Sequence, residues 1–286
     1  YIGQEALGVG SISALAPDDY VVSAYREHGL ALARGMAPRA VMAELFGKAT
    51  GCSKGKGGSM HLFDTSINFM GGHGIVGGQI PLGAGFAFAA KYRGTSQVSL
   101  TFFGDAAANI GSFHETLNMA GLWKLPCVFV IENNGYGMGT AIARAAAISD
   151  LWQRAASYGM PGVEVDGQDV VAVRLVTEEA VARAREGDGP TLIEARTFRY
   201  VGHSMLDAAC GTYRSKEELE ASRQRVQIVL FEEKLRGLGL IADGDIKAIE
   251  DEVAAVVADA VQFADASPDP DPSELTTDVY APEGGR

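Results

Sequence analysis

Two short apolar runs constrain the fold of this chain more than any other feature of its sequence. Val98–Phe103 (VSLTFF) ends at Gly104, and Cys127–Ile131 (CVFVI) follows a chain break at Pro126. Apolar runs of this length, bounded by glycine or proline, are typical of strands buried on both faces of a sheet. Between them, Ser112–Trp123 has apolar residues at helical spacing. The chain therefore predicts a strand–helix–strand unit with parallel strands.

The same alternation continues along the chain. We expect a helix near Leu151–Tyr158, a short strand at Val163–Val165, a helix over residues 170–186 and a strand at Thr191–Ala195. Buried strands that alternate with amphipathic helices indicate βαβ units. The predicted fold class is α/β, with a parallel sheet flanked by helices on both faces.

Glycine is concentrated before residue 90, in the runs Gly51–Gly58 (GCSKGKGG) and Gly71–Gly78 (GGHGIVGG). Glycine weakens the interiors of helices and strands, so neither run is expected to form one. We predict ordered loops that bring backbone close to another group.

The character of the chain changes after Tyr213. Residues 216–238 and 243–264 predict two charged amphipathic helices, and the acidic, proline-rich stretch SPDPDPSEL predicts an extended arm. We expect an α/β domain over residues 1–213, with residues 214–286 packed on the same domain.

Composition narrows the possible functions. The net charge of −12 argues against a nucleic-acid partner, and no apolar stretch is long enough to predict a membrane span. The three cysteines, Cys52, Cys127 and Cys210, are scattered and odd in number. This pattern disfavours a disulfide framework or zinc site and favours a reducing compartment, so we expect a cytoplasmic location. Because the chain opens at Tyr1 without a methionine, we expect a preceding segment.

Polar residues follow both buried runs. Gly104–Asn109 (GDAAAN) follows the first and Glu132–Gly137 (ENNGYG) the second. If the strands are neighbours, Asp105 and Asn134 face one crevice at the carboxyl edge of the sheet. Their oxygens suit Mg²⁺, and a helix beginning near Ser112 would direct its N-terminus at an anion there. A magnesium ion bridging a diphosphate is one hypothesis.

The local chemistry alone favours a simpler interpretation. Asp105 has the character of a helix N-cap, and Asn133–Asn134 has the character of a turn. Surrounding motifs change this balance. Gly104–Asp105, then 26 residues after Ala106, then Asn133–Asn134 resembles the GDG…NN signature of thiamine-diphosphate enzymes.

Further motifs are similar to the alpha subunit of the E1 component of 2-oxo acid dehydrogenases, pyruvate dehydrogenase first and acetoin dehydrogenase close behind. They occur in family order over nearly the whole chain. They are GQEA (Gly3–Ala6), AYREHG (Ala24–Gly29), KGKGGSMH (Lys54–His61), GGHGIVGGQIPLGAG (Gly71–Gly85), NMAGLWKLP (Asn118–Pro126), ENNGYGMGT (Glu132–Thr140) and FRYVGHSM (Phe198–Met205).

This resemblance implies a thiamine-diphosphate-binding fold with Mg²⁺, an α₂β₂ heterotetramer with an E1 beta subunit, and oxidative decarboxylation of a 2-oxo acid. The acyl fragment would pass to a lipoyl-bearing E2 acyltransferase. Pyruvate is the preferred substrate because KGKGGSMH and NMAGLWKLP look pyruvate-type; acetoin and branched-chain substrates are alternatives. No stretch resembles the glutamate that activates the cofactor, which the family takes from the beta subunit. The chain alone should therefore be inactive.

The resemblance also implies individual site residues. The implied magnesium ligands are Asp105, Asn134 and the carbonyl of Tyr136. The implied diphosphate contacts are Tyr25, Arg26, Arg199 and His203, with backbone from Ala106 and Ala107. Gly74 and Val76 would lie along the aminopyrimidine, and His203 would also be catalytic, helping to position the acyl exchange and to stabilise charge.

Several alternatives stay open. Arg26 could pair with Glu27 or another carboxylate, and His203 could cap a turn with Ser204. Ser204 matches a position that is phosphorylated in mitochondrial relatives, but a structural hydroxyl is the simpler expectation.

Two departures from the family pattern bear on the cofactor. Ala106 stands where the family has glycine; the methyl would be costly at positive φ or against a phosphate. It is also the one hint of a non-catalytic paralogue. The loop Asp207–Thr212 differs from the family's loop.

A nicotinamide-binding enzyme is the rival from another class: Gly72, Gly74 and Gly77 give GxGxxG, but we expect no strand before them.

Overall fold

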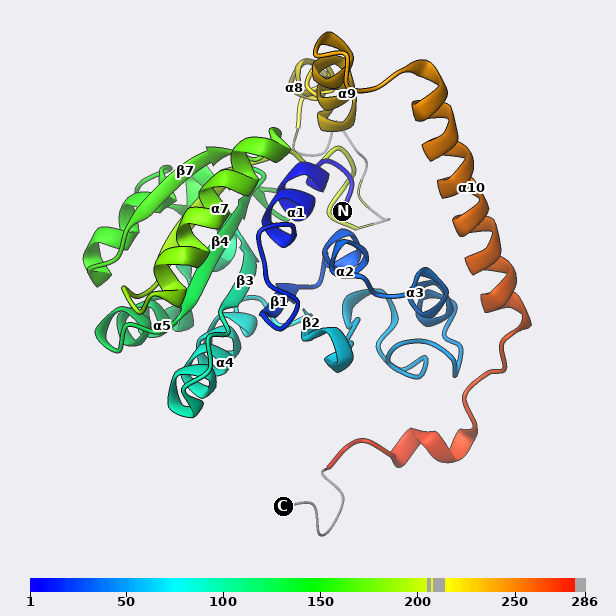
Figure 1. The fold of residues 1–286 in the computed structure, drawn as a ribbon. Coiled ribbons are helices and arrows are strands. Elements are labelled where there is room, and N and C mark those ends of the chain that lie inside the picture. Colours follow the sequence, from blue (N-terminus) through cyan, green and yellow to red (C-terminus); the bar gives the residue numbers. More distant parts are fainter. Residues whose placement is uncertain (205–206, 208–213, 281–286) are drawn as a thin grey trace.

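A six-stranded parallel sheet forms the centre of the molecule (Figure 1). The computed structural model describes residues 1–204, 207 and 214–280. The strand order is β2-β1-β3-β4-β8-β7. The strands are β1 (Tyr20–Ala24), β2 (Phe69–His73), β3 (Ser99–Gly104), β4 (Cys127–Asn133), β7 (Gly162–Asp166) and β8 (Thr191–Arg196). A separate antiparallel hairpin pairs β5 (Tyr136–Gly137) with β6 (Thr140–Ala141).

Helices cover both faces of the sheet (Figure 1). On one face lie α1 (Glu5–Ile12), α2 (His28–Arg34) and α7 (Val170–Arg185); on the other lie α4 (Gln79–Arg93) and α5 (Gly111–Leu122). The central strand β4 explains this arrangement, since its apolar side chains alternate between two cores. Val128 and Val130 join the first core, whereas Phe129 and Ile131 join the second. The sheet is therefore buried on both faces, as the sequence predicted.

Local signals set the ends of the helices. The Asp169 carboxylate accepts hydrogen bonds from the backbone of Val171 and Ala172 and so begins α7. Helix α4 ends at Gly94, which adopts the left-handed conformation (φ 68°). The remaining short elements are α3 (Pro38–Leu45), α6 (Ile142–Ala145), η1 (Gly58–Met60), η2 (Thr65–Ile67), η3 (Asp105–Asn109) and η4 (Leu151–Tyr158).

The predicted strands and helices from residue 98 to 196 are confirmed in order and type, with one difference. Leu151–Tyr158 is a 3₁₀ helix rather than an α-helix. Two strands before residue 98, β1 and β2, were not predicted. Both have only five residues, and β2 contains two glycines.

The expectation that Gly71–Gly78 forms no strand interior is wrong, because Gly71 and Gly72 lie inside β2. At Gly72 the reason is a close approach: a Cβ atom would lie 2.0 Å from Oε1 of Glu27. Glycine is kept in this strand because no side chain fits there. Strand β2 also directly precedes Gly74 and Gly77, so the expectation that no strand comes before them is wrong. A nicotinamide-binding site therefore has to be rejected on other grounds.

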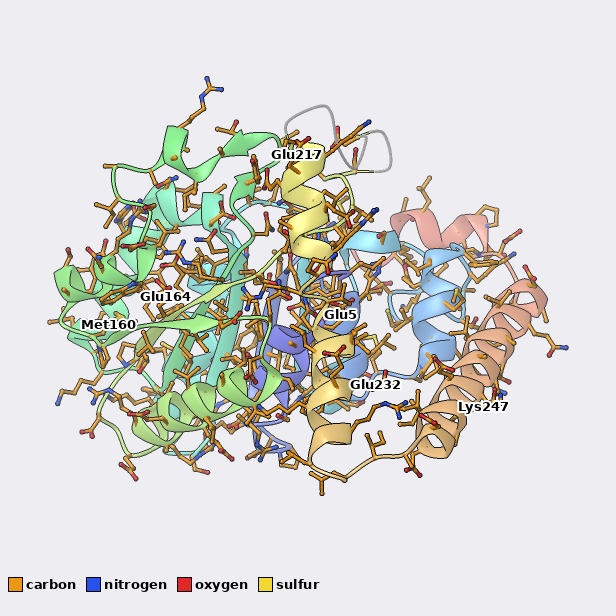
Figure 2. The ribbon with its side chains drawn as sticks, turned by 90° about the horizontal axis from the view of Figure 1, so that it is seen from above. Glu5, Met160, Glu164, Glu217, Glu232 and Lys247 are labelled. Atoms are coloured by element: carbon orange, nitrogen blue, oxygen red, sulfur yellow. The ribbon has the colours of Figure 1, made fainter. Side chains whose placement is uncertain are left out.

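The C-terminal part consists of helices α8 (Lys216–Arg223), α9 (Gln227–Gly237) and α10 (Asp243–Ala266), followed by the 3₁₀ helix η5 (Pro272–Thr276). Glu217, Glu232 and Lys247 lie on these three helices (Figure 2). The prediction of one helix over 216–238 is wrong, and so is that of a wholly extended arm. The break falls at Val226, whose backbone is extended, and it places the side chain of Gln227 in a buried position near α1.

Two predictions reach beyond the residues that the structure describes. The altered loop Asp207–Thr212 lies outside them except for Asp207, and Cys210 lies outside them as well. Cys52 and Cys127 are free thiols. Within the described ranges, no helix combines the length and the apolar character that crossing a membrane requires.

Candidate functional site

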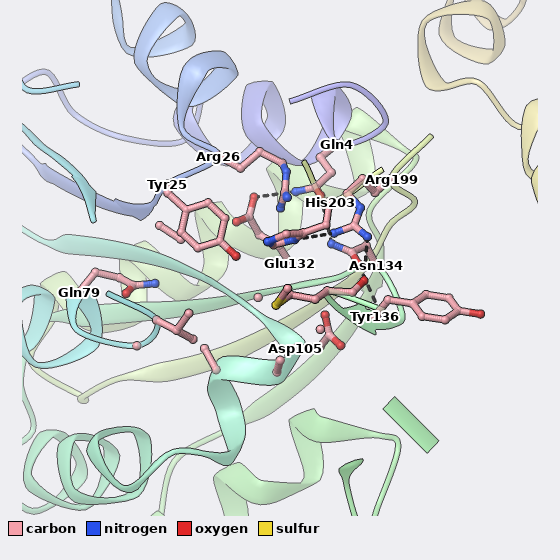
Figure 3. A pocket seen from close by; sticks show the side chains of 18 residues that line it. Gln4, Tyr25, Arg26, Gln79, Asp105, Glu132, Asn134, Tyr136, Arg199 and His203 are labelled. Carbon is pink, nitrogen blue, oxygen red and sulfur yellow. Dashed lines mark hydrogen bonds between the residues drawn. The ribbon is translucent and has the colours of Figure 1, made fainter. Parts of the chain in front are cut away.

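A cavity of about 260 Å³ opens at the carboxyl edge of the sheet (Figure 3). Residues that follow five strands, β1, β2, β3, β4 and β8, line it. Strand β1 lies between β2 and β3. The chain therefore passes from β1 to its neighbour on one side, β2, and then to its neighbour on the other side, β3. Open parallel sheets bind ligands at such a reversal of strand order.

Asp105 stands on one wall of this cavity, where β3 passes into η3. Its side chain is 2% exposed, and burial raises its pKa to about 6, an effect that Arg199 opposes. Asp105 is the first residue of η3, and the N-cap position is occupied by Gly104. The N-cap interpretation is therefore wrong. A buried carboxylate that faces a cavity is suited to a cation.

The turn after β4 brings Asn134 and Tyr136 to the same cavity. Strands β3 and β4 are paired, so the condition that Asp105 and Asn134 share one crevice is met. Asn133 has a different role: its Oδ1 accepts a hydrogen bond from the backbone of Gly135 at 2.9 Å, and its Nδ2 donates to the Glu194 carboxylate. The turn interpretation is therefore correct for Asn133.

Tyr136 points its side chain away from the cavity (Figure 3). Its hydroxyl donates to Glu218 on α8 at 3.1 Å, and its ring packs against the Arg214 guanidinium at 4.6 Å. Arg214 also donates to the carbonyl oxygen of Asn134 at 2.8 Å. Because the ring is held elsewhere, Tyr136 offers backbone rather than side chain to a ligand.

Cationic and aromatic side chains form the wall opposite. Arg26 and Tyr25 follow β1, and the Arg26 guanidinium lies 5.6 Å from the centre of the Tyr25 ring. Arg199, 1% exposed, donates to Nδ1 of His203 at 3.3 Å and to the carbonyl of Met138 at 3.1 Å. Burial lowers the pKa of His203, and the positive charges of Arg26 and Arg199 lower it further.

The Arg26–Glu27 pair and the His203–Ser204 cap are wrong, although the charge of Arg26 does oppose the rise that burial causes in the pKa of another carboxyl, Glu132. Within the described part of the chain, no ion pair joins Arg26 to Glu27, whose carboxylate instead accepts from the backbone of Leu62 at 3.0 Å. The turn after His203 is closed by Asp207, whose carboxylate accepts from the backbone of Ser204. Arg26 and His203 thus both present their side chains to the cavity.

Of the other predicted residues, Val76, Ala106 and Ala107 line the cavity, whereas Gly74 does not. Gly74 lies against the His61 ring, 3.2 Å from where its Cβ would be. The backbone of Ala106 does not adopt positive φ. Its methyl faces Gly137, where a Cβ would lie 2.5 Å away. Ala106 is therefore accommodated without backbone strain, and only a close phosphate could make it costly.

The predicted contribution from the N-terminus of α5 is wrong. Helix α5 begins at Gly111, after the five residues of η3, and none of its residues lines the cavity. The start of η3 occupies that wall instead, and Ser112 is turned toward the carbonyl of Gly77.

Several lining residues were not predicted. They are Gln4, Ala24, Gly77, Gln79, Gly104, Glu132, Gly137 and Met138. Most lie inside motifs that the sequence did mark, so the available signal was their place next to predicted ligands. Gln79 keeps one atom, Oε1, without a hydrogen-bond partner among the described residues.

The cavity fits a diphosphate held by a hard cation. It combines one buried carboxylate, one amide and two arginines. Mg²⁺ takes a few protein oxygens and completes its shell with phosphate and water, while arginines form paired bonds to phosphate oxygens. Among the described residues, no group of three or more His, Cys, Asp or Glu side chains is arranged to hold a metal, so a cation in this cavity would rely on one carboxylate together with amide and carbonyl oxygens.

Beside the cavity, Glu27 makes stability depend on pH. It is fully buried, and burial raises its pKa from 4.5 to about 7. The folded state keeps a proton that the unfolded state has already released, so stability falls as pH rises from about 4.5 to about 7. By pH 8 we expect a loss of about 3 kcal/mol.

Glu27→Gln removes this titration. The variant should match wild type in urea unfolding below pH 5 and exceed it by up to about 3 kcal/mol at pH 8. Glu178→Gln, an exposed carboxylate on α7, is the control and should leave the pH profile unchanged. Parallel profiles for wild type and Glu27→Gln would contradict the assignment.

The fold and the cavity together define an open-sheet α/β protein with a ligand site, charged on opposite walls, at the carboxyl edge of its strands. A model of the family described as "Dehydrogenase E1 component" matches residues 1–273. The chain belongs to this family, which depends on thiamine diphosphate. Membership supplies the separate grounds on which the nicotinamide alternative is rejected.

Curated relatives support the same family over almost the whole chain. Pyruvate dehydrogenase E1 component subunit alpha of Rhizobium meliloti (strain 1021) is 51% identical over 280 residues, which cover 98% of this chain and 80% of the relative. The somatic, mitochondrial form from Homo sapiens is 47% identical over 98% of this chain and 70% of its own length. The Rickettsia felis protein of the same name is 45% identical, over 98% and 85%.

Proposed function

We propose that this chain is the alpha subunit of a thiamine-diphosphate-dependent 2-oxo acid dehydrogenase E1 and that pyruvate is its substrate. One observation carries the proposal: side chains suited to a cation and side chains suited to a diphosphate line the same cavity. The relatives named as pyruvate dehydrogenase alpha subunits support the choice of substrate.

In this proposal, Asp105, Asn134 and the backbone carbonyl of Tyr136 ligate Mg²⁺. Two of these are supported by position, since Asp105 and Asn134 follow paired strands and line one cavity. Tyr136 is supported by the anchoring of its side chain on Glu218, which leaves the backbone of the turn toward the cavity.

Arg26 and Arg199 bind the diphosphate, with Tyr25 and His203 beside it. Arg199 is held before any ligand arrives, because it already donates to the Met138 carbonyl and to His203. A preorganised guanidinium loses less entropy on binding phosphate than a mobile one. The backbones of Ala106 and Ala107 complete this end, and Val76 with the nearby Gly74 provides the path for the aminopyrimidine.

When bound, thiamine diphosphate supplies the carbanion that allows a 2-oxo acid to lose CO₂. His203 contributes a neutral imidazole, because burial and two arginines lower its pKa. Arg199 donates to its Nδ1, so the ring proton resides on Nε2. His203 would use that proton to stabilise negative charge and to position the acyl exchange with a lipoyl group on E2.

The proposal includes an E1 beta subunit, in an α₂β₂ heterotetramer that also docks a lipoyl-bearing E2. The beta subunit would supply the carboxylate that activates the cofactor. We also place the protein in the cytoplasm. The free thiols of Cys52 and Cys127 are in keeping with a reducing compartment.

Reconstitution tests this function directly. The chain is co-expressed with an E1 beta subunit and assayed with pyruvate, acetoin and branched-chain 2-oxo acids. We expect decarboxylation of pyruvate by the pair and none by the chain alone. Preference for acetoin or a branched-chain acid would reassign the substrate. Absence of thiamine diphosphate binding by the pair in calorimetry would instead indicate a non-catalytic paralogue.

A further inference from the structure

Gln4 lies between two polar residues of the cavity and touches both (Figure 3). Its Nε2 donates to Oε1 of Glu132 at 3.0 Å, and its Oε1 accepts from Nδ2 of Asn134 at 3.4 Å. All three side chains are buried, with exposed fractions of 1%, 4% and 7% for Gln4, Glu132 and Asn134. They form a continuous hydrogen-bonded row that ends at the proposed cation ligand.

The row has a direction, because each side-chain amide has a donor end and an acceptor end. Oε1 of Glu132 also accepts from the Tyr1 hydroxyl at 2.6 Å, so it receives donors from two sides. Gln4 therefore turns its NH₂ group to Glu132 and its oxygen to Asn134. Asn134 therefore donates to this oxygen from its own NH₂ group, which leaves the Oδ1 of Asn134 at the opposite end of its amide.

A second contact agrees with this orientation. The backbone N–H of Tyr136 lies 3.4 Å from Oδ1 of Asn134, on the side away from Gln4. Only an oxygen at that end can accept from it. Two neighbours thus select the same one of the two orientations that are possible for this amide.

We propose that Gln4 is a positioning residue that fixes the side-chain amide of Asn134 so that its oxygen, and not its NH₂ group, serves the divalent cation. This inference rests on the proposed magnesium role of Asn134. An NH₂ group has no lone pair for a cation, so a reversed amide would remove one ligand and place hydrogens in its way. Partners that orient a metal ligand in this way typically change metal affinity by about 10- to 100-fold.

The test measures Mg²⁺ rather than turnover. Thiamine diphosphate binding to the reconstituted α–β protein is followed by calorimetry while Mg²⁺ is titrated. Gln4→Met keeps the length of the side chain and loses both hydrogen bonds. We expect the Mg²⁺ concentration for half-maximal binding to rise at least about tenfold. The melting temperature of the cofactor-free protein reports any general loss of stability.

Gln227→Met is the matched control. Gln227 is also a buried glutamine, and it secures the same segment through the carbonyl of Gly3 and the backbone N–H of Ala6. It does not line the cavity. The control should lose stability as Gln4→Met does, yet keep the Mg²⁺ requirement within about twofold of wild type.

A double-variant comparison separates orientation from packing. In Asn134→Asp both ends of the side chain are oxygens, so no orientation remains to be fixed. Gln4→Met should therefore add no further Mg²⁺ requirement in that background. Asn134→Ser, whose single hydroxyl has no second end, gives the same comparison if the aspartate variant does not bind cofactor.

The outcomes separate the two proposals. The positioning role of Gln4 is overturned if the Mg²⁺ requirement of Gln4→Met is unchanged, or if it rises equally in Gln4→Met and Gln227→Met. In either case Mg²⁺-dependent binding by the wild-type pair would still support the proposed cofactor site. An equal rise in the wild-type and Asn134→Asp backgrounds overturns it as well, because the effect would then be packing. If the wild-type pair shows no Mg²⁺-dependent binding, the proposed function itself fails.

Discussion

Asp105→Ala should abolish binding of thiamine diphosphate with Mg²⁺ while leaving the chain folded. Asp105 is the only charged group among the proposed ligands, and its carboxylate is almost completely buried. Loss of one buried, charge-bearing ligand is expected to weaken cation binding at least about 100-fold, which places it beyond the range of calorimetry at millimolar Mg²⁺.

The fold should survive this change for an identifiable reason. Burial raises the pKa of Asp105 to about 6, so without a cation the ionised carboxylate is an unfavourable group in the folded state. Removing it should not lower the melting temperature of the cofactor-free protein. Circular dichroism and calorimetry on the same samples provide both readouts.

Asp188→Ala is the control for Asp105→Ala, since Asp188 is an exposed acid away from the cavity. It should bind cofactor like wild type. Cofactor binding by Asp105→Ala at wild-type Mg²⁺ concentrations would refute the metal role of Asp105. A large fall in melting temperature without cofactor would show that the carboxylate is structural instead.

Arg199→Met should weaken thiamine diphosphate binding about 100-fold at saturating Mg²⁺, equivalent to about 3 kcal/mol. Arg199 is buried beside the cavity, where its charge acts with little screening by water. The variant keeps most of the side-chain volume but cannot donate to a phosphate. Because Arg199 also holds Met138 and His203, a modest loss of melting temperature should accompany the loss of binding.

Arg196→Met controls for the loss of a positive charge nearby. Arg196 ends β8 and pairs with Asp150, Glu164 and Glu194, and it does not line the cavity. Its cofactor affinity should stay within about twofold of wild type, since Arg196 does not line the cavity and its charge is already paired with three carboxylates. Equal affinities in Arg196→Met and Arg199→Met would contradict the assignment of Arg199 to the diphosphate.

Much of the fold could be predicted because several strands are short, buried apolar runs, which are visible in the sequence. The residues of β3 and β4 are almost all buried and mostly apolar, so both strands stand out as short runs. Strands β1 and β2 did not. Strand β2 carries two glycines that are explained by tertiary contacts, Gly71 with the Phe63 ring and Gly72 with Glu27, and these contacts are invisible in the sequence.

The site divides in the same way. Motif resemblance located Asp105, Asn134, Arg26, Arg199 and His203, and all five line one cavity. Resemblance marked Gln4 within the motif GQEA but gave it no role, and its partner Asn134 lies 130 residues away in sequence. The contribution of the α5 N-terminus was predicted wrongly, since the sequence did not reveal that a turn of 3₁₀ helix intervenes.

The sequence by itself determined the α/β class, the parallel sheet and the family, because hydrophobic periodicity and motif order are properties of the linear chain. Only the tertiary structure decided that Asp105 is not an N-cap and that Arg26 does not pair with Glu27. It also decided how Ala106 is accommodated against Gly137 and which way the Asn134 amide turns. Each of these depends on what lies opposite a side chain. Those neighbours come from distant segments, and folding alone brings them together.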